Sequence, residues 1–429
     1  MINGELTSKD YRVIAVSSIG GILEFYDFII FALFATILSH LFFGKEASPF
    51  ISMLAIWGIF AAGYFVRPIG GIILAHFGDK YGRKKIFSLT IFLMAVPTFI
   101  IGLLPTYAAI GATAPILLLV FRICQGLAIG GEIPGSATFV YEHVPKSKAM
   151  IGQGALYAGV NAGILLGSLI GVILVKCMPH DALFSWGWRI PFFVGGILGV
   201  LGLYLRKRVS ETPVFKKILE HREQAKMPLK EVFKTSKSST IAGFFLVLVV
   251  AVTVTNFFIY FPSHLSMVLH YTLFTAFALN SIGLAIGGLC IYFTGVFAVK
   301  FKWNPSKIII SASIIFLIFG VPSYYIVSLH SVILLAITYI IFGISVGLFA
   351  GTFSTLILKS FKPNIRFSGY SVSYNIAFAI FGGLTPVFDD LLIKVTGSLF
   401  APGYLVLIAG IIGLLTVIYY KKYDNLEVE

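Results

Sequence analysis

Long apolar segments follow one another along the whole chain, and they constrain its fold more than any other feature. Each is close to, or longer than, the ~20 residues with which an α-helix crosses ~30 Å of hydrocarbon. Only 12% of the 429 residues are charged and 58% are hydrophobic, whereas a soluble domain carries ~25% charged residues. We therefore predict an all-α membrane protein of twelve transmembrane helices, with spans near residues 13–42, 49–77, 86–105, 114–141, 150–176, 189–206, 239–262, 272–299, 306–328, 331–358, 366–393 and 398–420.

The basic residues lie mainly between the spans, on one side of the predicted membrane. With a cytoplasmic N-terminus, 26 of the 32 lysines and arginines fall on the cytoplasmic side and 4 on the outer side, while Arg67 and Arg122 lie within spans. Cytoplasmic loops of membrane proteins are enriched in this way, so both termini are expected in the cytoplasm. The net charge of +14 then follows from topology, and we expect no nucleic-acid partner.

The longest polar stretch divides the spans into two sets of six. We predict an N-terminal six-helix bundle over residues 1–205, a cytoplasmic linker with a short amphipathic surface helix over 206–238, and a C-terminal six-helix bundle over 239–429. The start of the chain is short and polar, and we expect no removable signal peptide. The three cysteines have no metal-binding spacing, so we expect neither a metal site nor a cofactor.

Five ionisable side chains fall inside predicted spans of the first half: Glu24 and Asp27 in the first span, Arg67 in the second, and Arg122 and Glu132 in the fourth. A charge in this position costs ~2.5–3.5 kcal/mol on insertion and usually faces a cavity or a partner. The second half has almost none. Its Asp389 and Asp390 are expected near the outer end of the eleventh span, where water can reach them.

Glu24 and Asp27 are three residues apart and share one helix face. By helical rise, Asp27 lies ~20 Å into its span and Arg122 ~12 Å from the outer face, so they can pair if the spans adjoin. Burial favours a neutral carboxyl and a nearby arginine favours a charged one, so a movement that breaks the pair would change its proton affinity. The alternative is a static ion pair that only fixes helix packing.

The other buried charges also have structural explanations. Neighbouring polar groups could satisfy Glu24, and Arg67 could extend its side chain to the inner face. Glu132 follows Gly130 and Gly131 in the inner half of the fourth span, where the sequence shows no partner, which favours a functional role.

Six segments carry a family resemblance: GGILEFYDF (20–28), RPIGG with FGDKYGRKK (67–85), RICQGLAIGGE (122–132), GWRIPF (187–192), SETPVF (210–215) and RFSGYSVSYNIAFAIFGGLTP (366–386). In this order, over nearly the whole chain, they resemble the major facilitator superfamily and, within it, the metabolite:proton symporter family of osmolyte, α-ketoglutarate, shikimate and citrate carriers. The resemblance implies two six-helix bundles, proton-coupled transport and a location in a bacterial inner membrane.

The resemblance also implies roles for particular residues. The segment between spans two and three matches a cytoplasmic gate motif, made here of Gly78, Asp79, Gly82 and Arg83. In the family, such an acid and arginine form a latch that stabilises the outward-open state; the alternative is a plain positive-inside anchor. Arg122 matches an arginine implicated in proton transfer, whose partner in related carriers is an acid of the first span, as Asp27 is here.

The chain departs from the family pattern at several positions. Ala75 replaces the first glycine of the loop motif, and Ile133 and Pro134 stand where an aromatic residue and a glycine are usual. Pro134 predicts a kink in the fourth span. The corresponding loop of the second half, residues 298–307, lacks the acid and the Gly-Arg pair, so we expect a weaker or rearranged latch there.

Polar side chains at mid-membrane depth are candidates for binding the solute, although each could instead serve helix packing. The candidates are Tyr26, Arg67, Tyr157, Asn161, Asn256, Tyr260, Tyr374 and Asn375. Tyr374 and Asn375 rank first, because they fall inside one of the family segments.

These features predict a proton-coupled symporter, monomeric in the lipid bilayer, that imports a small carboxylate-bearing or zwitterionic metabolite by alternating access. The buried arginines favour a carboxylate, and the scarcity of charge in the second half favours a small or zwitterionic solute. An exporter of metabolites or drugs is the main alternative, although span five lacks the Gly-Pro step of antiporters. A non-transporting nutrient sensor is a remote one, and no catalytic or phosphate-binding motif indicates an enzyme.

Overall fold

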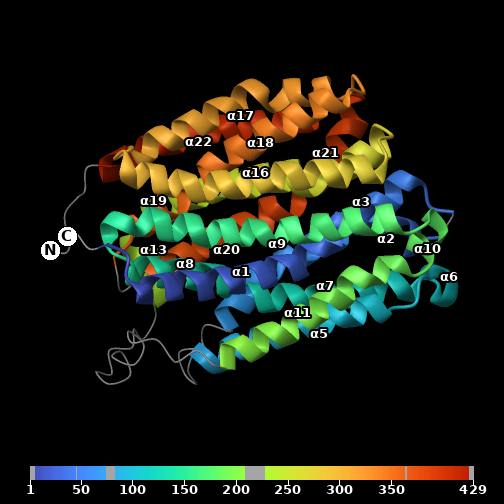
Figure 1. Cartoon of the computed structure of the whole chain (residues 1–429), viewed down its shortest axis with the longest axis horizontal. Helices are drawn as coiled ribbons and strands as arrows, with labels where there is room; N and C mark the ends of the chain where they lie inside the picture. Colours follow the sequence, from blue (N-terminus) through green and yellow to red (C-terminus); the bar gives the residue numbers. More distant parts are fainter. Residues whose placement is uncertain (1–4, 45, 74–82, 208–227, 363–364, 425–429) are drawn as a thin grey trace.

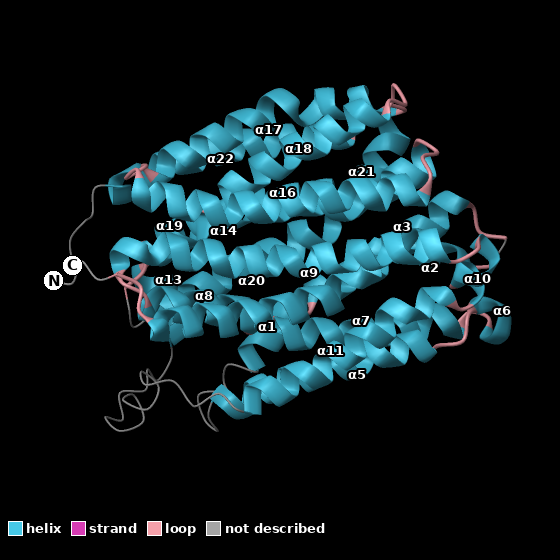
Figure 2. Ribbon diagram, in the orientation of Figure 1, coloured by secondary structure: helices cyan, strands magenta, loops and turns pink. Residues whose placement is uncertain are grey.

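The chain is helical throughout the part that is described. A computed structural model describes residues 5–44, 46–73, 83–207, 228–362 and 365–424, and Figure 2 shows helices joined by loops, with no strand in these ranges. The elements are α1 (Ser8–Leu33), α2 (Ala35–Leu41), α3 (Pro49–Phe65), α5 (Arg83–Leu103), α6 (Tyr107–Ile110), α7 (Thr113–Ile129), α8 (Glu132–His143), η1 (Lys146–Lys148), α9 (Ala149–Cys177), α10 (His180–Ser185), η2 (Gly187–Arg189), α11 (Ile190–Lys207), α13 (Pro228–Thr235), α14 (Lys237–Val254), η3 (Thr255–Tyr260), α15 (Phe261–Ser263), η4 (His264–Val268), α16 (Leu273–Lys300), α17 (Pro305–Val327), α18 (Val332–Ala350), α19 (Phe353–Lys359), α20 (Arg366–Ala377), η6 (Phe378–Gly382), α21 (Gly383–Thr396) and α22 (Pro402–Asp424).

Ten helical stretches of the described chain are long and apolar enough to cross a membrane. Two further apolar stretches, Phe92–Leu103 and Gly187–Gly202, are shorter and lie where the third and sixth spans are predicted. The ten are Ser8–Leu33, Pro49–Ile73, Thr113–His143, Lys146–Cys177, Lys237–Val268, Leu273–Lys300, Pro305–Val327, Val332–Lys359, Arg366–Thr396 and Pro402–Lys421. The predicted all-α fold with many apolar, membrane-length helices is therefore confirmed for the described chain.

The long helices lie side by side along the longest axis of the molecule (Figure 1). α5 packs against α11 on one side, α17 packs against α22 on the other, and α9 packs against α16 between them. α1 begins and α22 ends at the same end of the molecule, which we call the terminal face; α6 and α10 lie at the other end, the opposite face.

Glycines bring the second and fourth spans into direct backbone contact. A β-carbon added at Gly126 would overlap the carbonyl oxygen of Gly63, and one at Gly130 would overlap the carbonyl oxygen of Arg67. Small residues at such positions let helices approach closely in a membrane. This contact places Arg67 and Arg122 in neighbouring parts of the interior.

Several spans are interrupted near their middle. The fourth span breaks at Gly130–Gly131, so Pro134 lies in the first turn of α8 rather than at a kink of its own. Proline is tolerated there because its missing N–H has no partner in a first helical turn. The seventh and eleventh spans contain π-helical turns, η3, η4 and η6, a feature that is frequent at functional sites.

Candidate functional site

Arg122 holds a fully buried guanidinium against the first span. Its Nη1 donates to the backbone carbonyl of Phe28 at 2.7 Å and to Gln125 Oε1 at 3.1 Å. Its Cζ lies 3.7 Å from the centroid of the Phe28 ring. Gln125 in turn donates to the hydroxyl of Thr98 at 2.7 Å. Neutral acceptors and an aromatic face therefore hold this cation.

The predicted ion pair between Asp27 and Arg122 is not formed in this conformation, within the described part of the chain. Asp27 is buried and faces α11, where a β-carbon added at Gly195 would lie 2.5 Å from Asp27 Oδ1. Successive residues of an α-helix point ~100° apart, given 3.6 residues per turn. Because Phe28 covers Arg122, the preceding residue lies on a neighbouring face of α1.

Arg67 lies at the centre of an aromatic cage. Its Cζ is 5.1 Å from the ring centroid of Tyr64, 5.5 Å from that of Phe378, and 5.8 Å from those of Phe28 and Tyr374. The side chain of Arg67 is 0% exposed. It therefore does not extend to the inner face, which was the structural alternative for this residue. Its Nε, Nη1 and Nη2 have no hydrogen-bond partner among the described residues.

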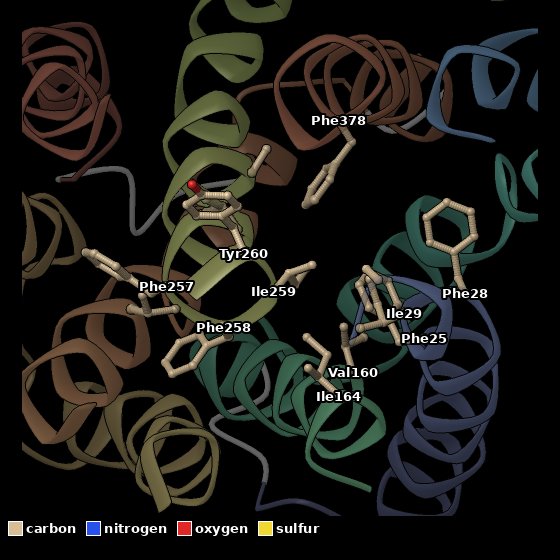
Figure 3. Packing of buried hydrophobic residues seen from close by; sticks show 14 of the residues in the cluster. Phe25, Phe28, Ile29, Val160, Ile164, Phe257, Phe258, Ile259, Tyr260 and Phe378 are labelled. Atoms are coloured by element: carbon tan, nitrogen blue, oxygen red, sulfur yellow. The ribbon is translucent and has the colours of Figure 1, made fainter. Parts of the chain in front are cut away.

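The cage joins distant parts of the sequence. Phe28 belongs to α1 and Tyr64 to α3, while Tyr374 and Phe378 belong to the eleventh span. In Figure 3, Phe378 points from its helix toward Ile259 of the seventh span, and Phe25 and Ile29 of α1 lie across from them. Arg67 is therefore enclosed by both halves of the chain.

Glu24 and Glu132 are both buried, as expected for residues within spans. Glu24 lies within electrostatic range of the Tyr374 hydroxyl, beside the cage. Glu132 stands in the first turn of α8, where the helix dipole favours a negative charge. Both carboxylates have interaction partners, so neither is an isolated charge.

Other predicted solute contacts form hydrogen bonds between spans. Tyr26 donates to the carbonyl of Pro191 at 2.8 Å, Tyr157 shares a short hydrogen bond with Tyr370, Asn161 donates to the carbonyl of Leu284 at 2.7 Å, and Asn375 donates to the carbonyl of Gly130 at 2.6 Å. In this conformation they act as links between helices, and Tyr374 is the first-ranked candidate that faces Arg67.

An ion pair that the sequence reasoning missed joins the two halves near the terminal face. Arg366 Nη1 lies 2.9 Å from Glu142 Oε1, and Arg366 Nε donates to the carbonyl of Leu358 at 2.9 Å. Arg366 and Glu142 each lie at the end of an apolar span. Their opposite charges at span ends were the only feature of the sequence that could have predicted this ion pair. The predicted gate residues Gly78, Asp79 and Gly82 and the side chain of Arg83 lie outside the described residues.

A second polar cluster, which we call the diacid cluster, lies between the seventh, ninth and eleventh spans. Asn256 Nδ2 donates to both oxygens of Asp389 at 3.1 and 3.0 Å, and the Tyr260 hydroxyl donates to Asp390 Oδ1 at 2.7 Å. The Tyr324 hydroxyl donates to Asn256 Oδ1 at 2.7 Å. Both acids were expected where water can reach them; Asp389 and Asp390 are 0% and 8% exposed, and of the two only Asp390 lines a described pocket. The turn η3 brings the amide and phenol over them.

A buried arginine without hydrogen-bond partners in the described chain, enclosed by both halves of a many-span helical protein, is the arrangement expected of a membrane transport protein. The chain belongs to the Major Facilitator Superfamily, whose family model matches residues 18–386. The predicted superfamily and the prediction of a multi-pass membrane transporter rather than an enzyme are thereby confirmed.

The relatives and neighbours are bacterial carriers. The glycine betaine/proline/ectoine/pipecolic acid transporter OusA of Dickeya dadantii is 32% identical over 96% of this chain and 84% of its own length. The proline/betaine transporter of Escherichia coli is 31% identical with the same coverage. The xylose transporter XylE of E. coli shares the fold with a TM-score of 0.71 at 18% identity, over 97% of this chain and 98% of that one.

Proposed function

We propose that the protein is a proton-coupled symporter that imports a small zwitterion of the betaine and proline class. The observation that carries the proposal is Arg67, a buried guanidinium whose three nitrogens lack hydrogen-bond partners in the described chain. Leaving such a charge unsatisfied is costly, so a site of this kind is suited to an anionic ligand.

The aromatic cage suits the other end of a zwitterion. A guanidinium binds a carboxylate through two parallel hydrogen bonds, and aromatic faces attract quaternary or secondary ammonium groups. Tyr64, Tyr374, Phe28 and Phe378 supply such faces around Arg67. Relatives named for betaine and proline transport support this choice of solute over a di- or tricarboxylate.

The proposed architecture is twelve spans in two bundles, over residues 1–205 and 239–429, with the terminal face in the cytoplasm. The shorter apolar stretches in α5 and α11 supply the third and sixth spans. The bias of lysine and arginine supports the orientation. Rocking of the bundles about the cage would then expose Arg67 alternately to each side.

Proton coupling is assigned to the first half. Asp27 is buried against α11 while Arg122 is held by neutral acceptors. A rotation of α1 that brings the Asp27 carboxyl to the Arg122 guanidinium would favour the ionised form of Asp27. In the conformation described here, burial of Asp27 away from Arg122 favours its protonated form. Glu24 and Glu132 are the additional candidates. The proton would be released when the pair forms.

The test is uptake of labelled glycine betaine into proteoliposomes with acid outside. We expect concentrative uptake by the wild type. In Asp27→Asn, we expect that uptake to be lost while exchange of labelled for unlabelled betaine continues, because only the coupling acid is removed. Full gradient-driven accumulation in Asp27→Asn would remove this acid from the mechanism.

Two control arms separate the alternatives. Reversing the proton gradient should abolish uptake; if acid inside instead drives accumulation, the protein is an exchanger or exporter. Excess proline should compete with betaine, whereas excess citrate or α-ketoglutarate should not. Competition by the dicarboxylate alone would overturn the solute class and leave the symport assignment standing.

A further inference from the structure

The diacid cluster lies outside the proposed solute cage and has no role in the mechanism described above. Asp389 and Asp390 are adjacent in sequence and both are at least nine-tenths buried. Two ionised carboxylates in one buried site repel each other and lose their hydration. A countercharge or a proton must therefore accompany them.

The cluster contains no cation within the described residues. Its hydrogen-bond donors are Asn256, Tyr260 and Tyr324, which are neutral groups. One basic side chain, His264, packs against the tyrosines of the cluster: it is 1% exposed, and its ring centroid lies 5.2 Å from that of Tyr324 and 5.8 Å from that of Tyr260. Neither of its ring nitrogens has a hydrogen-bond partner among the described residues, and a charged imidazole is costly to bury in that state.

The hydrogen bonds single out one oxygen for a proton. Both oxygens of Asp389 accept from Asn256 Nδ2, which is the pattern of a carboxylate. Asp390 Oδ1 accepts from the Tyr260 hydroxyl. Asp390 Oδ2 is buried and has no partner in the described chain, so a proton on this atom disturbs no hydrogen bond of the cluster.

Asp390 also lines a pocket between the two halves of the chain. This pocket, of about 460 Å³, has walls from Ser48, Phe50 and Ile51 at the start of the second span and from Lys394 of the same helix as Asp390. Lys394 Nζ lies 4.5 Å from the Phe50 ring centroid. The ammonium group disfavours a proton on Asp390 when the pocket admits water, and burial of the acid favours one.

We propose that Asp389 and Asp390 form a second proton-binding site, in the C-terminal half, which exchanges one proton with the opposite face through this pocket. Asp390 Oδ2 takes the proton from water and returns it to water, and no other bond is formed or broken. Because the pocket has walls from both halves, their movement would change access to the site. The site exists independently of the solute; only its use in coupling rests on the proposed function.

The test is infrared difference spectroscopy of the full-length protein in lipid nanodiscs, without solute or gradient, as the pH is raised. We expect the wild type to lose a carboxylic-acid C=O stretch and Asp390→Asn to lack that band. Asp181→Asn, which changes an exposed acid on α10, should leave it unchanged. A wild-type band in Asp390→Asn would overturn the proposal.

Three further measurements cover the remaining outcomes. Tyr260→Phe removes only the hydroxyl that donates to Asp390 Oδ1, so the band should shift in frequency; an unmoved band would contradict the assignment. Replacing choline chloride by sodium chloride at constant pH should have no effect, and loss of the band would show that a metal cation takes the place of the proton. Asp27→Asn should retain this band even if transport is lost, which separates failure of this proposal from failure of the proposed function.

Discussion

At the scale of single residues, the interior is organised around charges that lack ordinary partners. Arg122 uses a backbone carbonyl, an amide and a ring face, whereas Arg67 uses ring faces alone in the described chain. Arg122 has two nitrogens without a hydrogen-bond partner in the described chain, Nε and Nη2, whereas all three nitrogens of Arg67 lack one, so Arg67 has the larger unused capacity to bind an anionic ligand. Its replacement should therefore affect binding more than folding.

Arg67→Ala should weaken binding of glycine betaine about 10- to 150-fold, because net hydrogen bonds to charged groups contribute ~1.5–3 kcal/mol. The affinity of Arg67→Lys for glycine betaine should lie between those of the wild type and Arg67→Ala. Lysine keeps the positive charge but cannot form two parallel hydrogen bonds to a carboxylate. Titration calorimetry on purified protein measures both. Arg189→Gln at the opposite face, where Arg189 donates to the carbonyl of Ser185, is the matched control. Binding within twofold of wild type in Arg67→Ala would contradict the solute site.

At the scale of helices, glycine contacts and irregular turns decide which side chains meet. The contact of Gly63 with Gly126 sets the second span against the fourth. The turn η3 places Asn256 and Tyr260 where they donate hydrogen bonds to Asp389 and Asp390. A regular α-helix would distribute these side chains differently, because a π turn shifts the register of all residues that follow it.

Gly126→Ala should destabilise the protein by about 1–3 kcal/mol, as expected for overpacking of a tight interface. The new methyl group would overlap the Gly63 carbonyl, which belongs to the backbone and cannot move by itself. Gly58→Ala in the same second span is the control, because nothing lies within 4 Å of an added β-carbon there. Thermal unfolding in detergent compares the two variants. Equal unfolding midpoints would show that the second and fourth spans accommodate the methyl group of Gly126→Ala without loss of stability.

At the scale of the whole molecule, contacts between the halves hold this conformation near both faces. Arg366 pairs with Glu142 near the terminal face, and Thr36 donates to Ser263 at 3.2 Å toward the opposite face. The cage around Arg67 lies between them. Alternating access requires that one set of contacts can break while the other remains.

Arg366→Gln should favour opening of the terminal face. The ion pair is partly exposed, so its loss is worth ~0.2–1 kcal/mol and should accelerate thiol labelling about 1.4- to 5-fold. The probe is Ser354→Cys, at a buried position that bonds Gln153 across the halves, in a background without the native cysteines. Glu142→Gln should give the same increase, and the double variant should add nothing further. Additive effects would show that the two residues act separately.

Sequence reasoning predicted the spans well where the apolar run was uninterrupted. The ninth and tenth spans were expected at 306–328 and 331–358 and lie in Pro305–Val327 and Val332–Lys359. It placed Arg67, Arg122 and both first-span acids in the interior because burial of a charge is visible in any apolar window. The pairing of Asp27 with Arg122 was not found here, because spacing along one helix does not fix the rotation of that helix against another.

The amino-acid sequence by itself determined the helical membrane fold, its family and the presence of buried charges, since hydrophobic length and composition act locally along the chain. Only the tertiary structure decided that Arg67 lies in an aromatic cage, that Arg366 reaches Glu142, and that Asn256 and Tyr260 bond to the buried Asp389 and Asp390. Such contacts join residues that are far apart in the sequence; Arg366 and Glu142, for example, are separated by 224 positions. They depend on how helices rotate and pack, which no single span encodes.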